Sequence, residues 1–468
     1  MNLEALKTRL AEFSQSHVLQ FWDQLSEVER ESLVGQLEEI DFAQLSTLIA
    51  DEDEKPDFAA IAATAQAPPA VLADGSGASW TVDEATTRGE AALRAGEVGA
   101  ILVAGGQGTR LGFDRPKGMF PVGPVSNRTL FQVFADRLLA IGAIYGAAIP
   151  FYIMTSDATD AETRAYFEEN NYLGLKKEDV FIFRQGTMPA VDANSGKLLL
   201  ASKASLALSP DGHGGTVRAL DRSGALADAK KRGVKHLAYI QVDNPLVNLC
   251  DPTLIGHHLM SRSELTTQVI RKRYPMEKVG NIAIADGRVQ VIEYSDLPEQ
   301  AAEARDADGE LKLWAGSIGV HVIDVDFLVR IASQASALPF HRASKKVPYR
   351  NEAGERVDPT EPNAVKFEKF IFDLLPSAKN AFVVEVLPSD GFAPVKNADG
   401  AENDTPKLSR EAIVAQHRRW LEAAGAQLGE EVKVEINPRF SLTPAQLAEK
   451  IPANLKIDDD RYFAPELQ

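Results

Sequence analysis

The sequence predicts an α/β fold with a mixed, largely parallel sheet, preceded by a helical region and followed by a small α+β region. From residue 97 onward, short β-branched or aromatic runs alternate with segments of helical periodicity, which is typical of βαβ units. Residues 1–50 carry apolar side chains at helical spacing only. A glycine-rich turn follows the first β-branched run. These observations divide the chain into residues 1–95, 96–390 and 391–468.

The N-terminal region is predicted to contain several amphipathic helices and a linker. Its apolar residues recur three or four positions apart among charged residues, so each helix would present one apolar face. The segment from Ala59 to Gly77 is rich in alanine and proline and is expected to be an irregular linker. The apolar positions are Leu3, Leu6, Leu10, Phe13, Val18, Phe21, Trp22, Leu25, Leu33 and Leu37.

The central region is predicted to hold the sheet, because its β-branched runs alternate with helical segments. The last three runs are expected to frame a second substrate, within residues 263–400. The expected strands are 99–103, 150–155, 180–183, 236–242, 281–284, 287–292 and 319–323. The expected helices are 129–144, 160–170 and 218–232. The C-terminal region adds a strand at 431–436 and a helix at 442–450.

Polar residues follow the first four predicted strands at the point where each strand ends. The glycine-rich turn follows the first strand, and the next three end at residues 155–157, 184–186 and 243–244. In open α/β sheets, ligands bind outside the carboxyl ends of the strands. We therefore expect one binding site at this edge of the sheet.

The glycine-rich turn has the composition of a phosphate-binding loop. Four glycines stand within eight residues, at positions 105, 106, 108 and 112, and they are accompanied by Arg110 and Lys117. Glycine lets backbone N–H groups approach an anion closely and adopts the positive φ that such a turn requires. Arginine and lysine add full positive charge where phosphate oxygens would lie.

Two common phosphate fingerprints do not fit this turn. A P-loop requires G-x-x-x-x-G-K-[ST], but Gly112 is followed by Phe113 and Asp114. The dinucleotide fingerprint G-x-G-x-x-G fits Gly106 and Gly108 but places Leu111 at the third glycine. The turn is therefore a phosphate loop of another kind.

Composition excludes several classes of protein. At 468 residues the chain exceeds a single core, so two or three domains are expected. The formal net charge of −17 would repel nucleic acid, which binds a basic face. No run approaches eighteen uninterrupted apolar residues, so no membrane span is expected. The sequence has a single cysteine, Cys250, and no apolar signal segment, so a cytoplasmic location is expected, with Cys250 in the core.

The loop and the segments downstream of it resemble one family. Ala104 to Gly112, followed by Pro116-Lys-Gly118, is similar to the nucleotide loop of the eukaryotic-type UDP-sugar pyrophosphorylases (UDPGP type 1), and most closely to their UDP-N-acetylglucosamine pyrophosphorylase branch. The other similar segments occur in the family's order and span most of the chain. They are residues 173–177, 185–186, 210–215, 241–244, 291–295, 345–349, 366–370 and 394–399.

The resemblance implies a Rossmann-like, GT-A-like nucleotidyltransferase fold and a uridylyltransferase reaction. UTP and a sugar 1-phosphate, with N-acetylglucosamine 1-phosphate expected first, would give a UDP-sugar and pyrophosphate. Mg²⁺ is the expected cofactor, bridging the phosphates with few protein ligands. No nucleic acid or membrane partner is expected, and the oligomeric state is not predicted.

The resemblance also implies roles for individual residues. The residues that would cradle the uridine portion are Ala104, Gly105 and Gly106. Those that would hold the triphosphate are Arg110, Lys117 and Lys396, with Asp243 approaching the nucleotide and the metal. The uracil-reading positions are Gln185 and Gly212, and the sugar positions are His213, Gly280, Glu293 and Ser317. Without the resemblance, Gln185 is a strand-end residue, Asp243 a turn cap and Lys396 a loop lysine.

Two positions depart from the N-acetylglucosamine pattern and keep alternatives open. His213 and Ser317 each stand where that branch usually carries asparagine, so each removes an amide from the expected sugar pocket. The Gly-His-Gly sequence is closer to UDP-glucose and broad-specificity enzymes, whereas residues 366–370 and 394–399 favour the acetamido branch. A non-catalytic UDP-sugar-binding protein and an interaction protein working through its N-terminal helices are the other functional classes to be weighed.

The chain has two other dense basic segments, residues 271–273 and 345–346. Such segments are usually solvated loops rather than ligand sites, and both are expected to be solvated.

Overall fold

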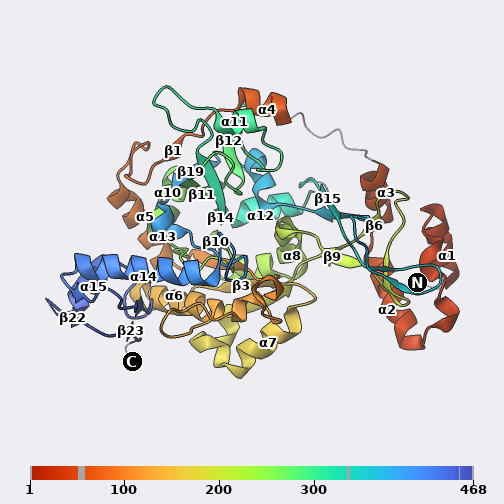
Figure 1. Ribbon diagram of the computed structural model, residues 1–468, viewed down its shortest axis with the longest axis horizontal. Coiled ribbons are helices and arrows are strands. Elements are labelled where there is room, and N and C mark those ends of the chain that lie inside the picture. Colours follow the sequence, from red (N-terminus) through yellow and green to blue (C-terminus); the bar gives the residue numbers. More distant parts are fainter. Residues whose placement is uncertain (1–2, 51–57, 335–337, 453, 466–468) are drawn as a thin grey trace. The chain divides into compact units, whose positions relative to one another are not determined.

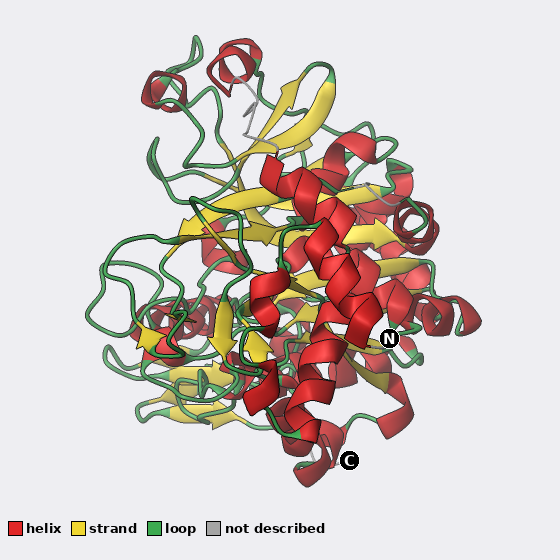
Figure 2. Cartoon of the chain, turned by 90° about the vertical axis from the view of Figure 1, so that its right-hand side faces the viewer, coloured by secondary structure: helices red, strands yellow, loops and turns green. Residues whose placement is uncertain are grey.

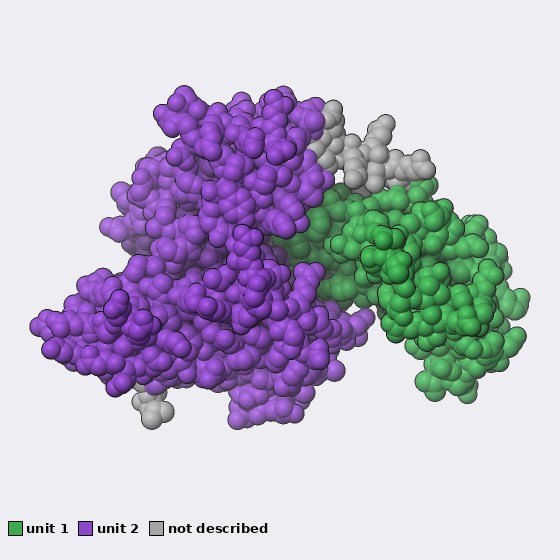
Figure 3. Space-filling model, viewed as in Figure 1, with its two compact units in different colours: residues 1–56, 185–218, 336–373 green, residues 57–184, 219–335, 374–468 purple. Residues whose placement is uncertain are grey.

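The chain forms two compact units, and each is built from segments far apart in the sequence (Figure 3). The computed structural model describes residues 3–50, 58–334, 338–452 and 454–465. Unit 1 comprises residues 1–56, 185–218 and 336–373, and unit 2 comprises residues 57–184, 219–335 and 374–468. This division differs from the three consecutive regions that composition suggested, because strand pairing joins segments that the sequence separates.

Unit 2 is organised around a ten-stranded mixed sheet (Figure 1). Its main path runs β1-β19-β11-β14-β10-β2-β3-β4, and β12 joins β13 and β14. The strands are β1 (Ala70–Val71), β2 (Val98–Val103), β3 (Phe151–Thr155), β4 (Val180–Arg184), β10 (His236–Gln241), β11 (Leu265–Arg271), β12 (Asn281–Ala285), β13 (Arg288–Ile292), β14 (Ala315–Asp324) and β19 (Phe382–Glu385). Because β10, β2, β3 and β4 run parallel while β14 is antiparallel to both β10 and β11, the predicted mixed, largely parallel sheet is confirmed.

Helices connect and cover these strands (Figure 2). Capping boxes at Thr81 and Thr129 begin α5 and α6, each with the partner side chain three residues on. The helices are α4 (Phe58–Thr64), α5 (Val82–Arg94), α6 (Leu130–Tyr145), α7 (Asp160–Glu169), α9 (Ala225–Lys231), α10 (Pro252–Met260), α11 (Glu299–Glu303), α12 (Val325–Ala332), α13 (Pro388–Gly391), α14 (Pro406–Ala423) and α15 (Pro444–Lys450). The short 3₁₀ helices are η3 (Thr109–Leu111), η4 (Lys117–Met119), η5 (Asn171–Gly174) and η6 (Lys177–Asp179).

A small C-terminal subregion belongs to unit 2 and has its own apolar cluster, which includes Leu421, Val434 and Phe463. Its strands are β20 (Gln427–Leu428), β21 (Val434–Ile436), β22 (Lys456–Ile457) and β23 (Arg461–Phe463). Together with α14 and α15 they form the α+β region that the sequence predicted.

Unit 1 packs the N-terminal helices against short strands. Its core includes Leu6, Leu33, Val191 and Phe367, so helical and strand segments more than 150 residues apart share one apolar cluster. The elements are α1 (Leu3–Glu12), η1 (Ser16–Leu19), η2 (Trp22–Gln24), α2 (Glu27–Glu39), α3 (Phe42–Ala50), β5 (Thr187–Pro189), β6 (Val191–Asp192), β7 (Leu200–Ser202), β8 (Ser205–Leu206), β9 (Leu208–Pro210), η7 (His213–Gly215), β15 (His341–Lys345), β16 (Tyr349–Arg350), β17 (Arg356–Val357) and β18 (Ala364–Glu368). Helix α8 (Thr216–Arg222) and η8 (Ile371–Ser377) cross the unit boundaries.

Two local predictions are wrong. The supposed irregular linker from 59 to 77 contains α4 and β1, because its alanines favour a helix and β1 finds a parallel partner in β19. The helix expected at 218–232 is two helices, because Gly224 adopts a φ of 82° between α8 and α9. No helix among the described residues has the length and apolarity needed to cross a membrane.

Candidate active site

The glycine-rich turn forms a closed loop at the carboxyl end of β2. The amide of Lys117 donates to the main-chain oxygen of Gly106 at 3.0 Å, and the amide of Gly108 donates to that of Arg115 at 2.9 Å. The chain therefore folds back on itself and returns Lys117 to the foot of the loop. The carboxyl end of β3 holds the other side, where the hydroxyl of Ser156 donates to Gly105 at 2.7 Å.

Glycine is required at particular positions of this loop. A Cβ on Gly108 would lie 2.6 Å from the main-chain oxygen of Phe113, and one on Gly118 would lie 2.2 Å from the ring of Phe131. Gly112 has a φ of 70°, which L side chains rarely adopt. Gly106 differs from these, since a Cβ there would meet nothing within 4 Å. Its exposed face leaves room for a ligand to approach the backbone.

The structure gathers three of the predicted charged residues around a fourth, Lys117. Burial lowers the pKa of Lys117; the Asp243 carboxylate opposes this effect, and the charges of Lys396 and Arg110 add to it. These electrostatic effects require proximity, although the four residues span nearly 290 positions in the sequence. Three cations and one carboxylate thus form a locally positive site in a chain of net charge −17.

Asp243 and Lys396 are tied together by backbone contacts. The amide of Val395 donates to the main-chain oxygen of Asp243 at 2.8 Å. The side chain of Asn244 donates to the oxygen of Gly391 at 2.8 Å and accepts from the amide of Ala393 at 3.0 Å. The loop that carries Lys396 is therefore anchored to the carboxyl end of β10.

Asp404 is a residue of this site that the sequence analysis missed. Its carboxylate lies 4.0 Å from the amine of Lys396, and its main-chain oxygen accepts from the amide of the same lysine at 2.8 Å. Burial raises the pKa of Asp404, while Lys396 and Arg273 oppose the effect and Asp243 adds to it. In the sequence, Asp404 precedes Thr405 and Pro406, a signal for a helix start that carries no hint of a charged site.

The basic segment 271–273 is not the solvated loop expected from its composition. Lys272 is buried and donates to Asn281 at 2.6 Å and to the main-chain oxygen of Pro275 at 3.1 Å. Burial lowers its pKa to about 8, against the opposing charge of Glu277. Glu277 also accepts from the backbone and side chain of Arg273, each at 2.7 Å.

Three residues predicted to contact the sugar lie together in unit 2. A Cβ on Gly280 would lie 3.1 Å from the carboxylate of Glu293 and 3.8 Å from the Cβ of Ser317. The amide of Ser317 donates to the main-chain oxygen of Gly280 at 2.8 Å. Glu293 follows β13, Gly280 precedes β12, and Ser317 belongs to β14, so the sheet pairing of β12 with both neighbours brings them together.

The other predicted positions, Gln185, Gly212 and His213, belong to unit 1. The amide of Asp211 donates to the main-chain oxygen of Gly186 at 3.1 Å, so the segments after Gln185 and before Gly212 are adjacent. Gly212 has a φ of 83°, and a Cβ there would lie 2.4 Å from the main-chain oxygen of Lys369. This close approach explains why a glycine stands at that turn.

His213 is held as a neutral ring. Its Nδ1 accepts from the amide of Ile371 at 3.2 Å, and the ring stacks on Phe370 at 5.3 Å between centroids. Burial, assisted by His341, lowers the pKa of His213 to about 4. Because Nδ1 is occupied as an acceptor, the ring proton lies on Nε2, which makes Nε2 a donor.

Comparison with known proteins gives one consistent result. A family model described as UTP–glucose-1-phosphate uridylyltransferase matches residues 81–453. A UDP-N-acetylglucosamine pyrophosphorylase of Saccharomyces cerevisiae is 38% identical over 95% of this chain and 96% of its own length. A UDP-N-acetylhexosamine pyrophosphorylase-like protein 1 of Xenopus tropicalis is 37% identical over 94% of this chain and 89% of its own length.

A solved structure extends the likeness to three dimensions. The uridine diphosphate N-acetylglucosamine pyrophosphorylase of Trypanosoma brucei superposes with a TM-score of 0.80 at 27% identity and covers 98% of both chains. The chain therefore belongs to the UTP–glucose-1-phosphate uridylyltransferase family of nucleotidyltransferases.

Proposed function

We propose that this enzyme transfers the uridylyl group of UTP to N-acetylglucosamine 1-phosphate, giving UDP-N-acetylglucosamine and pyrophosphate. The observation that carries the proposal is the clustering of Arg110, Lys396 and Asp243 around the half-buried Lys117 at the glycine-rich loop. A triphosphate needs such a set of cations, since the chain as a whole would repel it.

The reaction requires the protein to stabilise negative charge, and it does not require a general base. An oxygen of the sugar phosphate, already anionic, attacks the α-phosphorus of UTP; the new P–O bond forms as the bond to the β-phosphate breaks. Negative charge builds on the α-phosphoryl oxygens and on the departing pyrophosphate. We assign neutralisation of this charge to Lys117, Arg110 and Lys396, and we assign backbone contact with the nucleotide to Ala104, Gly105 and Gly106.

We propose Mg²⁺ as the cofactor, with Asp243 as its protein ligand. The donor chemistry fits, because Mg²⁺ prefers oxygen ligands and commonly binds one or two carboxylates together with waters and substrate phosphates. Asp243 provides a half-buried carboxylate beside the cations expected to bind those phosphates. When bound, the ion would neutralise phosphate charge, while Lys117 and Lys396 orient the chain of phosphates.

The acceptor sugar is assigned to the cluster of Gly280, Glu293 and Ser317. A carboxylate such as Glu293 can accept from two sugar hydroxyls. We expect the acetamido sugar to be a better substrate than glucose 1-phosphate, because the two relatives compared above are named for N-acetylglucosamine and N-acetylhexosamine. UDP-glucose synthesis is the second candidate, since His213 and Ser317 replace amides of the acetamido branch.

Pyrophosphate release from UTP tests the proposal directly. The full chain with Mg²⁺ is mixed with UTP and with N-acetylglucosamine 1-phosphate, N-acetylgalactosamine 1-phosphate or glucose 1-phosphate, and kcat/KM is measured for each. We expect the N-acetylglucosamine compound to be used best and Lys117→Ala to lower its kcat/KM by roughly 100- to 1,000-fold. Lys230→Ala, which removes an exposed lysine paired with Asp326, is the matched control and should retain full activity. Wild-type activity in Lys117→Ala would contradict the role of Lys117.

His213→Asn tests sugar choice separately. The substitution restores the amide that the acetamido branch carries, so the ratio of kcat/KM for N-acetylglucosamine 1-phosphate to that for glucose 1-phosphate is expected to rise. An unchanged ratio would exclude His213 from sugar selection. We further propose a cytoplasmic location, because the chain's single cysteine suits a reducing compartment.

A further inference from the structure

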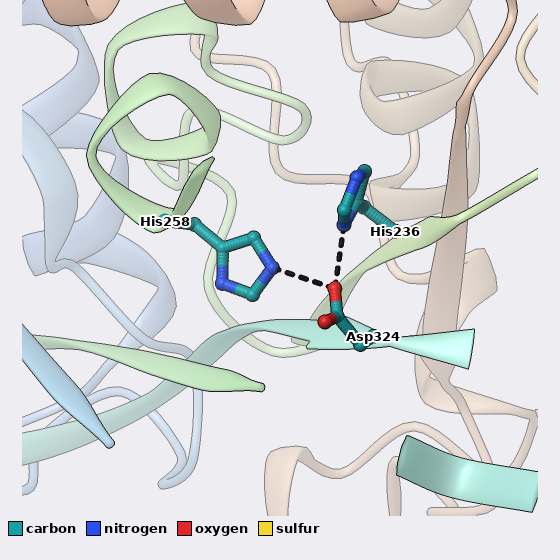
Figure 4. Close-up of side chains that lie close together, drawn as sticks. All are labelled: His236, His258 and Asp324. Atoms are coloured by element: carbon teal, nitrogen blue, oxygen red, sulfur yellow. Dashed lines mark hydrogen bonds and ion pairs between the residues drawn. The ribbon is translucent and has the colours of Figure 1, made fainter. Parts of the chain in front are cut away.

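Two histidines and an aspartate meet at the end of the sheet opposite the glycine-rich loop (Figure 4). His236 Nδ1 lies 2.6 Å from Asp324 Oδ1, and His258 Nε2 lies 2.9 Å from the same oxygen. His236 begins β10, whereas the nucleotide loop lies beyond the other end of that strand. Five residue steps, at roughly 3.3 Å each, separate the two ends by about 17 Å.

The fold brings these side chains together from three elements. His236 and Asp324 are direct partners in the antiparallel pairing of β10 with β14, so their side chains share one face of the sheet. His258 comes from α10, which packs closely on α5. Gly256 permits that packing, since a Cβ there would lie 1.7 Å from the main-chain oxygen of Ala85. His258 is therefore held rigidly above the strand pair.

The carboxylate of Asp324 is directed to the histidines rather than to the helix that it precedes. Asp324 is the N-cap residue of α12, a position at which an aspartate usually accepts from an amide of the first turn. Here its side chain makes no capping hydrogen bond, and Oδ1 faces both imidazole rings instead. Helix α12 therefore lacks the stabilisation of a side-chain N-cap, and Asp324 makes its contacts with the two histidines instead.

The second nitrogen of His258 also has a fixed partner. His258 Nδ1 lies 2.9 Å from the hydroxyl of Thr266 in β11, and both residues are almost fully buried. A threonine hydroxyl can donate to this nitrogen or accept from it. Without an ion, Nε2–H can donate to Asp324; when an ion lies between them, His258 can carry its proton on Nδ1 and offer a bare Nε2 as a ligand, the arrangement found in histidines that bind a metal.

We propose that His236 Nδ1, His258 Nε2 and Asp324 Oδ1 form a binding site for a divalent transition metal ion such as Zn²⁺. The three ligand atoms lie within 4.8 Å of one another, so bonds of about 2.0–2.2 Å to a common ion require only a small separation of the present contacts. Two imidazoles and a carboxylate suit zinc, whereas Mg²⁺ prefers oxygen ligands. The side chain of Asp324 is 29% exposed, so solvent can reach the site and supply a fourth ligand.

The expected role is structural. The ion would tie the start of β10, the end of β14 and helix α10 together, at a distance from the uridylyl-transfer site. A metal ion that binds only the native state raises the melting temperature once its concentration exceeds Kd. Zinc should therefore stabilise the chain without changing kcat measured with Mg²⁺.

Equilibrium dialysis tests the site with zinc itself as the probe. The full chain is stripped with a chelator and dialysed against Zn²⁺ in excess Mg²⁺, and we expect one zinc ion per chain. Removing a ligand by His236→Gln or Asp324→Asn should weaken zinc binding by at least about 100-fold and abolish the rise in Tm. His341→Gln removes a histidine paired with Asp373 in unit 1 and is the matched control. Because glutamine can still donate a hydrogen bond to Asp324, His236→Gln is expected to fold even where Asp324→Asn does not.

A second pair of variants separates metal binding from simple packing. Thr266→Val removes the hydroxyl that orients His258 and should weaken zinc binding about 10- to 100-fold. Thr267→Val removes the buried hydroxyl of the next residue on β11, whose side chain points to the other face, and should leave zinc binding unchanged. Substitution of Co²⁺ should give the visible absorption of a nitrogen- and oxygen-ligated ion in the wild type and in Thr267→Val. Absence of stoichiometric zinc, or equal binding by His236→Gln and wild type, would overturn the proposal.

Discussion

The amide of Val395 donates a 2.8 Å hydrogen bond to the main-chain oxygen of Asp243. This contact joins the end of β10 to the loop of Lys396, across 152 residues of sequence. The backbone segments that carry Asp243 and Lys396 are therefore fixed to one another, and the charges of both side chains act on Lys117.

The lowered pKa of Lys117 predicts an early alkaline limit of activity. Burial favours its neutral form, so Lys117 loses its proton at a lower pH than an ordinary lysine with a pKa of 10.5. The pH dependence of kcat/KM for UTP reports the ionisation of the free enzyme. As the pH is raised, kcat/KM should begin to decline before the pH reaches 10.5. Lys117→Arg keeps its charge throughout this range, so its residual activity should fall only at higher pH. Identical alkaline limbs in the two proteins would assign the limit to another group.

Asp404 is expected to position Lys396. Asp404→Asn removes the carboxylate 4.0 Å from the lysine amine and should lower kcat. In a double-mutant cycle, Lys396→Met combined with Asp404→Asn should be no slower than Lys396→Met alone, because the aspartate acts through the lysine. Glu411→Gln, which breaks the exposed ion pair of Lys407 and Glu411, is the control and should leave kcat unchanged. Additive losses in the cycle would show that Asp404 acts independently.

Gly280→Ala should damage sugar binding selectively. The new Cβ would lie 2.8 Å from Val291 and 3.1 Å from the carboxylate of Glu293, so the glutamate must move. A misplacement of about 1 Å can cost roughly 100-fold in rate. We expect KM for the sugar 1-phosphate to rise while KM for UTP stays constant. Gly35→Ala, in open space within α2, is the control; a parallel rise in both KM values would argue against a sugar-specific role.

The neutral state of His213 predicts a loss of stability in acid. Its folded-state pKa of about 4 lies below the ordinary value of 6.5, so between these pH values the unfolded chain binds a proton that the native chain does not. This contribution is complete above pH 6.5 and is lost as the pH falls toward 4, by up to about 3 kcal/mol. Urea unfolding of wild type and His213→Asn at pH 7.5 and 4.5 measures it. The stability difference between the two proteins should change with pH; a constant difference would mean that His213 does not titrate in this way.

Cys250 should be unreactive in the native chain. It is buried, as predicted from the sequence, and burial raises the pKa of its thiol to about 12. A thiol reagent at pH 8 should therefore label no cysteine in the native protein and one per chain in denaturant. Rapid labelling of the folded protein would place this thiol in contact with solvent.

The sequence by itself determined most of the local elements and the glycine-rich loop. Strands such as β2 and β10 are continuous apolar runs, so they were predictable from the order of residues. The glycine-rich loop was predictable because several glycines and two cations directly follow β2. Parallel strands place their carboxyl ends at one edge, which also made the convergence of the strand ends predictable.

Only the tertiary structure decided which distant residues meet. The ion pair of Arg271 with Glu385, the hydrogen bond from Val395 to Asp243 and the pairing of β6 with β18 in unit 1 all depend on chain segments brought together by folding. The histidines at 236 and 258 gave no signal, because metal-ligand spacing in sequence is absent when the ligands come from a sheet register and a packed helix. Hydrophobic periodicity encodes which face of an element is buried, but it does not encode which other element covers that face.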